Sequence, residues 1–277
     1  MCDVVVVGSL NMDLIVRAER LPNSGEIISG KDFRIIPGGK GANQAASIAH
    51  LGNSVAMVGR GGCDVFGHRP LENLSTFGVH TSHIKLDESA PTSTSTIIID
   101  AEDENWIIVV AGANARVNTS DIDTAIDLIK QAKLLVMQFE FPLITVSYAV
   151  EVGRRHRIRV ILNPAPARAV PDSLLTNIDY LVLNETEATL LSGVPVTDIS
   201  AAGRAATALR ARGAEVVILT LGEKGALIAT DEEVLHVPTS RVKAVDTTEA
   251  GVAFIGGLVT GLISNESLLD SVQLANA

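Results

Sequence analysis

Short, continuous apolar runs recur along the chain, and they restrict its fold more than any other feature. The first, Val4–Val7, is apolar at every position and ends at Gly8, which is typical of a parallel strand buried on both faces. Similar runs lie at 54–58, 134–139, 160–163, 180–183 and 216–219, and helical segments separate most of them. We therefore expect an α/β fold, and 277 residues suffice for one large domain.

The longest apolar stretch, 250–263, does not predict a membrane span. It is too short to cross a bilayer and is interrupted by Gly251, Gly256, Gly257 and Gly261. The N-terminus enters a strand almost at once, without a basic segment ahead of a long apolar run, so we expect no signal peptide. A cytoplasmic protein without a membrane partner is the expectation.

Charge and cysteine content exclude further classes of function. The net charge of −10 argues against a nucleic-acid partner, and we interpret the basic cluster at 154–159 as a solvated surface. Cys2 and Cys63 are far apart and lack metal-ligand spacing, so we expect unpaired thiols in a reducing compartment.

Two regions, at about 14–37 and 92–111, interrupt the α/β pattern. Their short extended pieces and alternating residues predict antiparallel strands that form a small sheet projecting from the main domain. An exposed apolar sheet face of this kind covers a site or pairs with another subunit.

Polar residues near the ends of the first strands are candidates for ligand binding. Asn11 and Asp13 point the same way in an extended segment and can hold one polyol; the alternative is an Asx turn. The glycine-rich segment 37–46 then opens a helix, with Gly39 and Lys40 in the turn and Asn43 in the first helical turn. It permits close approach of a ligand to the backbone, but it lacks the glycine spacing of a P-loop.

Later strand ends carry a second set of candidates, each with a plain structural alternative. Glu140 either faces the ligand crevice or is a surface acid. Asn184 and Glu187 lie at the start of a helix. The structural alternative to ligand binding is that an acid in the first turn complements the helix dipole. Thr220 begins a turn that contains Gly222 and Gly225. The edge of a nucleotide can lie on these small residues; the alternative is an ordinary β-turn.

The segment 244–257 joins a strand end to a helix rich in small residues. Asp246 and Glu249 have the spacing of a helix N-cap with its reciprocal carboxylate three residues later. Ala250 and Gly251 leave backbone amides uncovered at a helix N-terminus, which is an anion site. The alternative is a capped helix packed on its neighbour.

Two segments together resemble the signatures of the ribokinase (PfkB) family of carbohydrate kinases. Residues 246–252, Asp-Thr-Thr-Glu-Ala-Gly-Val, are similar to the family's Asp-Thr-x-Gly/Ala-Ala-Gly-Asp signature, and residues 38–45, Gly-Gly-Lys-Gly-Ala-Asn-Gln-Ala, to its first signature. The resemblance implies a three-layer α/β sandwich spanning 1–277, with a central, mostly parallel sheet. It also implies that the strands from about 14–37 and 92–111 form a lid, and that the lid sheet joins two copies in a homodimer.

The resemblance also assigns roles to residues. The positions expected to bind the sugar are Asn11, Asp13, Gly39, Lys40, Asn43 and Glu140. Those expected at the nucleotide are Asn184, Thr220, Gly222, Gly225 and Asn276. Glu187 is expected to help hold hydrated Mg²⁺ through water, and Asp246 and Thr248 are expected to bind K⁺. Residues 249–251 are expected to form the anion hole. The implied ligands are ATP, Mg²⁺, K⁺ and a sugar. Ribose is the expected sugar, although the sequence does not distinguish ribose from deoxyribose. The final segment of the family, with the remaining K⁺ ligands, is missing, so we expect an incomplete K⁺ site.

The chain departs from the family at the positions that carry the reaction. Val252 stands where the family has its Asp base, and Glu249 replaces a small residue of the anion hole. We therefore expect ATP-dependent phosphorylation of D-ribose to ribose 5-phosphate to be impaired, with Glu249 occupying the anion hole. The alternative is a non-catalytic, sugar-binding pseudokinase.

Overall fold

The computed structural model of the chain describes residues 2–240 and 249–277. Within these ranges the strands form one large sheet of nine strands and one small sheet of four. The large sheet has the spatial order β13 (Val234–Val237), β12 (Ala226–Ala229), β11 (Val216–Thr220), β10 (Tyr180–Asn184), β9 (Arg159–Leu162), β8 (Leu134–Met137), β1 (Val4–Val7), β4 (Val55–Gly62) and β5 (His80–Asp87). Neighbouring strands from β11 to β5 pair in parallel, whereas β12 and β13 pair antiparallel at one edge.

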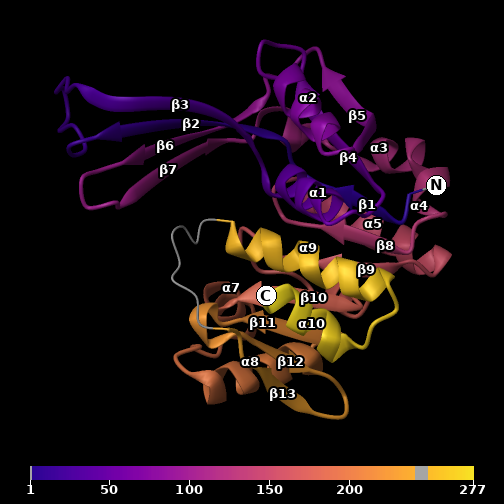
Figure 1. The fold of residues 1–277 in the computed structure, drawn as a ribbon. Helices are drawn as coiled ribbons and strands as arrows, with labels where there is room; N and C mark the ends of the chain where they lie inside the picture. The colour runs from indigo at the N-terminus through magenta and orange to yellow at the C-terminus, as the bar shows by residue number, and fades with distance from the viewer. Residues whose placement is uncertain (1, 241–248) are drawn as a thin grey trace.

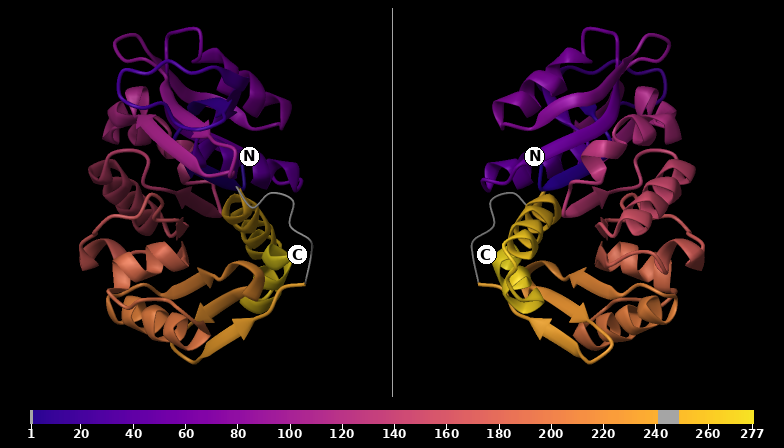
Figure 2. Two further views of the ribbon diagram at one scale, coloured as in Figure 1. Left: turned by 90° about the vertical axis from the view of Figure 1, so that its left-hand side faces the viewer. Right: turned by 90° about the vertical axis from the view of Figure 1, so that its right-hand side faces the viewer.

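Helices cover both faces of the large sheet, and this confirms the expected three-layer α/β architecture (Figure 2). One face packs against α1 (Lys40–His50), α2 (His68–Thr76), α9 (Ala250–Ile263) and α10 (Leu268–Asn276). The other packs against α3 (Thr119–Thr124), α4 (Ile126–Ile129), α5 (Leu143–His156), α6 (Asp172–Leu175), α7 (Glu185–Ser192) and α8 (Ile199–Ala211). Two 3₁₀ helices, η1 (Gly112–Arg116) and η2 (Gly222–Lys224), complete the helical elements of the described residues.

Strand β1 shows why a continuous apolar run forms the centre of such a sheet. All four of its valines are fully buried; Val4 and Val6 contact one helical layer, and Val5 and Val7 the other. Because successive side chains of a strand point to opposite faces, a strand with helices on both sides needs an apolar residue at every position.

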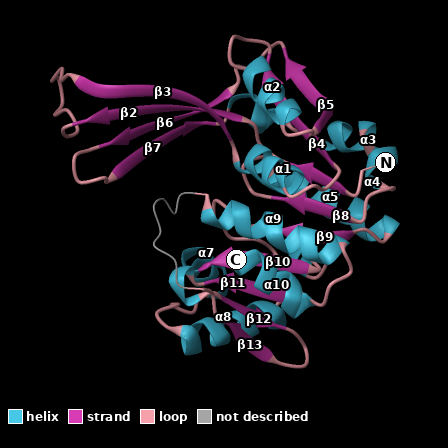
Figure 3. Ribbon diagram, viewed as in Figure 1, coloured by secondary structure: helices cyan, strands magenta, loops and turns pink. Residues whose placement is uncertain are grey.

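The small sheet projects from the large one as an arm made of strands joined by turns (Figures 1 and 3). Its order is β3 (Gly30–Gly38), β2 (Asn11–Ala18), β6 (Ser93–Ile99) and β7 (Asn105–Val110). The hairpins β2–β3 and β6–β7 are antiparallel as predicted, but the pairing of β2 with β6 is parallel, which corrects the expectation of a wholly antiparallel sheet. Parallel pairing follows because both hairpins leave the main domain in the same direction.

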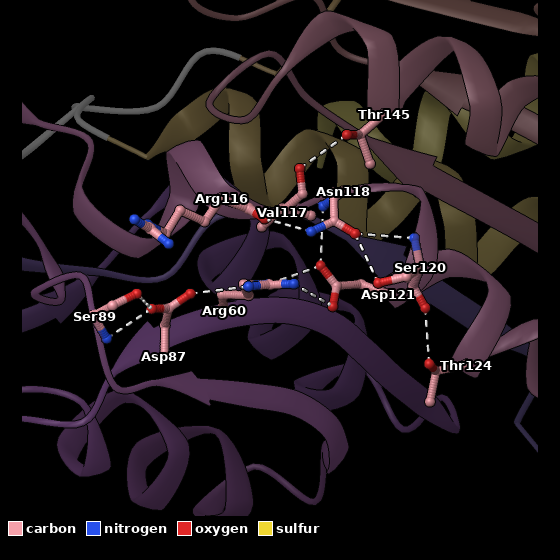
Figure 4. Close-up of polar contacts among 10 residues, drawn as sticks. All are labelled: Arg60, Asp87, Ser89, Arg116, Val117, Asn118, Ser120, Asp121, Thr124 and Thr145. Carbon is pink, nitrogen blue, oxygen red and sulfur yellow. Dashed lines mark hydrogen bonds and ion pairs between the residues drawn. The ribbon is translucent and has the colours of Figure 1, made fainter.

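A buried ion-pair network holds the elements at the base of the arm (Figure 4). The Arg60 guanidinium of β4 donates from Nε and Nη2 to the two carboxylate oxygens of Asp121, at 2.8 and 3.0 Å, and from Nη1 to Asp87 at 2.9 Å. Asp121 also forms a capping box with Asn118 at the start of α3. A fork of two parallel hydrogen bonds has a defined geometry. The network therefore fixes α3, and the preceding η1, against β4.

Two further findings bear on the expectations from sequence. No helix in residues 2–240 and 249–277 is long and apolar enough to cross a membrane. Both cysteines are free thiols, with Cys2 buried and Cys63 exposed.

Candidate active site

A cavity of about 680 Å³, hereafter the large cavity, lies where the small sheet meets the large one. All six residues expected to bind a sugar line it: Asn11, Asp13, Gly39, Lys40, Asn43 and Glu140. Further lining residues that the sequence did not single out include Ser95, Asn114, Phe139 and Arg168. The tertiary structure thus brings together residues from the start of β2, the start of α1 and the segment after β8.

Asn11 and Asp13 belong to β2 of the small sheet, which begins three positions earlier than the predicted boundary at residue 14. Because β2 is extended, the two side chains face the same side, and no Asx turn forms. Burial raises the pKa of the Asp13 carboxyl; a hydrogen bond from Ser95 opposes this shift, and the charge of Glu140 reinforces it.

The turn before α1 requires glycine for both conformation and space. Gly39 has φ = 98°, and a Cβ at this position would lie 2.9 Å from the Asn11 nitrogen and from the Ser9 oxygen. A positive φ and such short distances exclude other residues without strain. The turn therefore places the first residues of α1 directly against the loop that follows β1.

Glu140 is held by the backbone at the start of α1. Its Oε2 accepts a hydrogen bond from the Lys40 amide at 2.9 Å and a second one from the Ser9 hydroxyl. The Ser9 Oγ in turn accepts from the Gly41 amide at 3.2 Å. The uncapped N-terminus of α1 thus uses a carboxylate and a hydroxyl as partners, which its unsatisfied amides favour.

Asn114 of η1 is a buried residue that fixes the entry to β2. Its Oδ1 accepts from the Leu10 amide at 3.0 Å, and its Nδ2 donates to the Asn11 Oδ1 at 2.7 Å and to the Leu10 oxygen at 3.2 Å. The sequence offered only an asparagine in a turn, so nothing in the pattern pointed to its partner more than 100 residues away.

Arg168 adds a cation to the wall of the large cavity. Its guanidinium lies 4.8 Å from the centroid of the Phe139 ring, and its Nη2 donates to the Phe141 oxygen at 2.9 Å. Burial lowers the pKa of this guanidinium. Because Phe139 and Phe141 flank Glu140, these contacts bracket the turn that carries the Glu140 carboxylate.

A second cavity of about 240 Å³, hereafter the small cavity, adjoins the first. Asn184, Glu187 and Thr220 line it, together with Asn163, Gly251 and Val252. Lys40 and Glu249 line both cavities. The candidate sugar residues and part of the candidate nucleotide residues therefore meet at one junction.

Asn184 and Glu187 also perform the structural role that the sequence left open. They form a capping box at α7, in which the Glu187 amide donates to the Asn184 Oδ1 at 2.8 Å and the Asn184 amide to the Glu187 Oε2 at 3.0 Å. Burial raises the pKa of the Glu187 carboxyl, while the charge of Lys40 opposes the shift.

The remaining nucleotide candidates lie outside the lining of the small cavity. Gly222 is in η2 with φ = 56°. Gly225 packs so closely on β13 that a Cβ would lie 2.2 Å from the Val237 oxygen. Asn276 donates to the same oxygen from its Nδ2 at 3.1 Å. The fold thus brings Gly225 and Asn276 to one point.

The structure corrects the predicted start of α9. The helix begins at Ala250, with Glu249 at the N-cap position and no side-chain hydrogen bond to the helix amides, so Glu249 is not the third residue of a capping box. Asp246 and Thr248 lie outside the described residues.

The Glu249 carboxyl lies among the charged residues of the junction. It accepts a hydrogen bond from Asn43 and is close enough to Lys40 for the two charges to interact. The residue as a whole is exposed, yet loss of hydration around the carboxyl raises its pKa, and the charges of Asp13 and Glu140 add to this effect. Within residues 2–240 and 249–277, no group of three or more His, Cys, Asp or Glu is arranged to hold a metal ion.

Comparison with known proteins places this geometry in a family. Residues 1–277 match the model of the pfkB family carbohydrate kinases. The chain is 42% identical over 278 residues to a ribokinase of Mus musculus, covering 99% of this chain and 86% of that protein. It is 40% identical over 255 residues to a deoxyribokinase of Salmonella typhi, covering 92% and 83%.

A solved structure shows the same architecture. The ribokinase of Arabidopsis thaliana complexed with ribose and ATP superimposes with a TM-score of 0.94 and 31% identity, covering 99% of this chain and 90% of that one. The match of the whole chain to the family model and the level of identity to its relatives show that the protein belongs to the pfkB family of carbohydrate kinases.

Proposed function

We propose that this chain binds D-ribose in the large cavity and ATP in the small cavity, as an ATP-dependent ribokinase whose phosphoryl transfer is impaired. The observation that carries the proposal is the convergence of Asn11, Asp13, Gly39, Lys40, Asn43 and Glu140 on one cavity that shares Lys40 and Glu249 with a second. Carboxylates and amides suit sugar hydroxyls, and a helix N-terminus suits phosphate. The relatives named ribokinase, and the one solved with ribose and ATP, support this assignment of ligands.

Impairment follows from the side chain at the reacting position. Phosphoryl transfer to a sugar hydroxyl needs a group that accepts the hydroxyl proton, and general bases of this kind contribute typically ~10²–10⁴-fold to the rate. Val252 lines the small cavity beside Glu249 and cannot accept a proton. Positioning of the two substrates alone then supports only residual turnover.

Glu249 opposes the second substrate. Its carboxylate precedes the first turn of α9, where the exposed amides favour an incoming phosphate. The carboxylate makes no hydrogen bond to these amides, so it does not occupy them as expected, but its negative charge repels a phosphate group and competes with it for Lys40. We therefore expect weakened ATP binding, in addition to the slow chemical step.

Glu187 fits a role in holding hydrated Mg²⁺, because its carboxylate lines the small cavity and oxygen ligands suit this ion. Bound there, Mg²⁺ supplies charge neutralisation of the phosphates. For K⁺, the expected residues Asp246 and Thr248 lie outside the described residues.

We further propose one domain over 1–277 in which the small sheet serves as a lid, a cytoplasmic location, and a homodimer formed through the small sheet. Trp106, Ile108 and Val110 of β7 are 37%, 65% and 53% exposed and lie on the same side of the strand. A row of exposed apolar residues on an edge strand favours association.

The alternative function is a sugar-binding pseudokinase that does not turn over. It is favoured by one specific asymmetry: all six sugar candidates line the large cavity, whereas Val252 and Glu249 alter the transfer position.

ADP release in the presence of ribose, ATP, Mg²⁺ and K⁺ tests both functions. We would compare the parent chain with the double variant Glu249→Ala, Val252→Asp, using ribose titration calorimetry on both. Turnover by the double variant alone supports an impaired kinase, and ribose binding without turnover by either supports the pseudokinase. Efficient turnover by the parent, or no ribose binding, contradicts the proposal.

A further inference from the structure

Three amide side chains, two fully buried and one half-buried, form a hydrogen-bonded chain beneath the junction of the two cavities. The Gln138 Nε2 donates to the Gln44 Oε1 at 2.6 Å, and the Gln44 Nε2 donates to the Asn163 Oδ1 at 3.1 Å. The last hydrogen bond of this amide chain runs from the Asn163 Nδ2 to the backbone oxygen of Val182, at 3.1 Å. Gln44 and Gln138 are fully buried.

The amide chain crosses the carboxyl ends of neighbouring strands. Gln138 directly follows β8, Asn163 directly follows β9, and Val182 belongs to β10, which are adjacent in the large sheet. Gln44 comes from α1, on the helical layer above them (Figure 1). The chain therefore ties the first turns of α1 to the strand ends that form the floor of both cavities. Asn163 and Val182 themselves line the small cavity.

The other end of the amide chain lies against the glycine contact that seats α1. The Gln138 Oε1 is buried without a hydrogen-bond partner, and a Cβ added to Gly8 would lie 2.4 Å from it and 2.6 Å from the Gly41 Cα. Gly41 is the second residue of α1. The backbone of α1 thus approaches Gly8, directly after β1, so closely that no side chain fits between them, which leaves the helix little freedom to shift.

The position of α1 decides the geometry of the large cavity. Lys40 and Asn43 extend from its first turn, and its amides hold Glu140 and Ser9. The N-cap residue of this turn, Gly39, has no side chain to cap it. Gln44 is the next residue after Asn43. Of the three hydrogen-bonded amides Gln138, Gln44 and Asn163, it is the one that belongs to α1. Gln44 itself lines neither cavity, so it does not contact a ligand in either.

We propose that Gln44 is a positioning residue that sets the first turn of α1 for sugar binding and, through Asn163, couples the occupancy of the two cavities. The proposal rests on the assignment of ribose to the large cavity and nucleotide to the small one. Removing one member of a buried amide chain leaves its neighbours unsatisfied, and they regain partners only if α1 or a strand end moves. A shift of this kind changes the placement of Lys40 and Asn43.

The test compares Gln44→Met with the parent chain and with a matched control. Methionine has nearly the length and volume of glutamine but cannot replace either hydrogen bond. Gln131→Met makes the same substitution at an exposed glutamine whose Nε2 bonds only to the Asp127 oxygen. For each protein, calorimetry gives the Kd of ribose with and without saturating ADP and Mg²⁺. Hydrogen exchange of the amides of residues 40–43 reports on the helix turn without any ligand.

We expect Gln44→Met to raise the Kd of ribose by about tenfold, because α1 then no longer holds Lys40 and Asn43 in place; this is about the net free energy of one hydrogen bond. We also expect it to bring the ratio of the two Kd values close to one and to accelerate exchange at 40–43. Gln131→Met should match the parent in all three. Because allosteric coupling is reciprocal, the effect of ribose on the Kd of ADP should shrink by the same factor.

Other outcomes separate the possible failures. If Gln44→Met lowers the melting temperature but leaves the ribose Kd, the Kd ratio and the exchange rates as in the control, Gln44 has only a structural role and the proposal is overturned. If the parent binds no ribose, the proposed function fails, and the exchange rates alone decide whether Gln44 positions the turn. Should Gln44→Met not fold, Gln138→Met removes one donor only and must shift the same readouts in the same direction.

Discussion

Lys40 and Glu249 line both cavities, so a cation from the start of α1 and a carboxylate from the start of α9 stand together at the junction. Lys40 favours a phosphate group at this point, whereas Glu249 opposes it. The pair is formed from residues more than 200 positions apart, and its balance decides whether a nucleotide phosphate can approach the sugar.

Neutralising Glu249 should tighten nucleotide binding. We expect Glu249→Gln to lower the Kd of ADP by about tenfold at low ionic strength, and by less at high salt, because ions screen the repulsion between this carboxylate and a phosphate. The control Glu223→Gln removes an exposed carboxylate that does not line the small cavity. Calorimetric titration at two salt concentrations measures the effect; equal affinities of Glu249→Gln and the parent would exclude competition by this carboxylate.

Asn114 should be required for both stability and sugar binding. Asn114→Asp keeps the acceptor for the Leu10 amide but places a carboxylate oxygen against the oxygens of Asn11 and Leu10. We expect a loss of about 1–3 kcal/mol in the free energy of unfolding and weaker ribose binding. Urea denaturation and calorimetry, with the exposed Asn265→Asp as control, measure both. Unchanged ribose affinity would show that the Asn11 side chain needs no support from η1.

Two glycine substitutions should have opposite effects on stability. Gly39→Ala forces a Cβ into a positive-φ turn against Ser9 and Asn11, and we expect it to cost about 1–3 kcal/mol and to abolish ribose binding. Gly203→Ala in the interior of α8 meets only ordinary contacts with Val234 and Leu227, and we expect a gain of about 0.5–1 kcal/mol. Thermal unfolding distinguishes the two; destabilisation by both would mean that α8 also tolerates no side chain at this position.

The Arg60 network should make stability depend on pH in the acid range. Hydrogen bonds from Ser89, with help from Arg60, lower the pKa of Asp87 to about 2. A folded-state pKa below the unfolded value means that the stabilisation is fully present above about pH 4 and is lost as the pH falls towards 2.

Asp87→Asn should therefore be less stable than the parent at pH 7, and the difference should shrink as the pH falls from about 4 to 2, because asparagine resembles the protonated carboxyl. Denaturant unfolding over this range measures the difference. Asp127→Asn, at an exposed residue paired only with Lys130 at 3.7 Å, is the control. A difference that stays constant with pH would show that Asp87 acts through packing alone.

The apolar row on β7 predicts the state of association. If the small sheet joins two copies, Ile108→Asp should convert a dimer to a monomer in light scattering, because a buried carboxylate without a partner is unfavourable. Ile27→Asp, at a residue that is 97% exposed outside the strands, should leave the mass unchanged. A monomeric parent at working concentration would exclude the homodimer.

The pattern of apolar residues along the sequence was sufficient to predict the layers of the fold. Val4–Val7 must be a buried parallel strand because apolar side chains at successive positions need cover on both faces. Asn11 and Asp13 face one side for an equally local reason, since a strand has a period of two. The signature segments added the family, and with it the set of residues that line the large cavity.

What the sequence determined by itself was therefore local: strand and helix type, the glycine turn at Gly39, and the side chains altered at Val252 and Glu249. The tertiary structure decided which distant groups meet. Nothing in the chain indicated that Asn114 holds Asn11, that Gln44 bonds to Gln138 and Asn163, or that β2 pairs in parallel with β6. These contacts depend on the packing of α1, η1 and two hairpins around one sheet edge, and a hydrogen bond between remote side chains forms only when that packing brings donor and acceptor within about 3 Å.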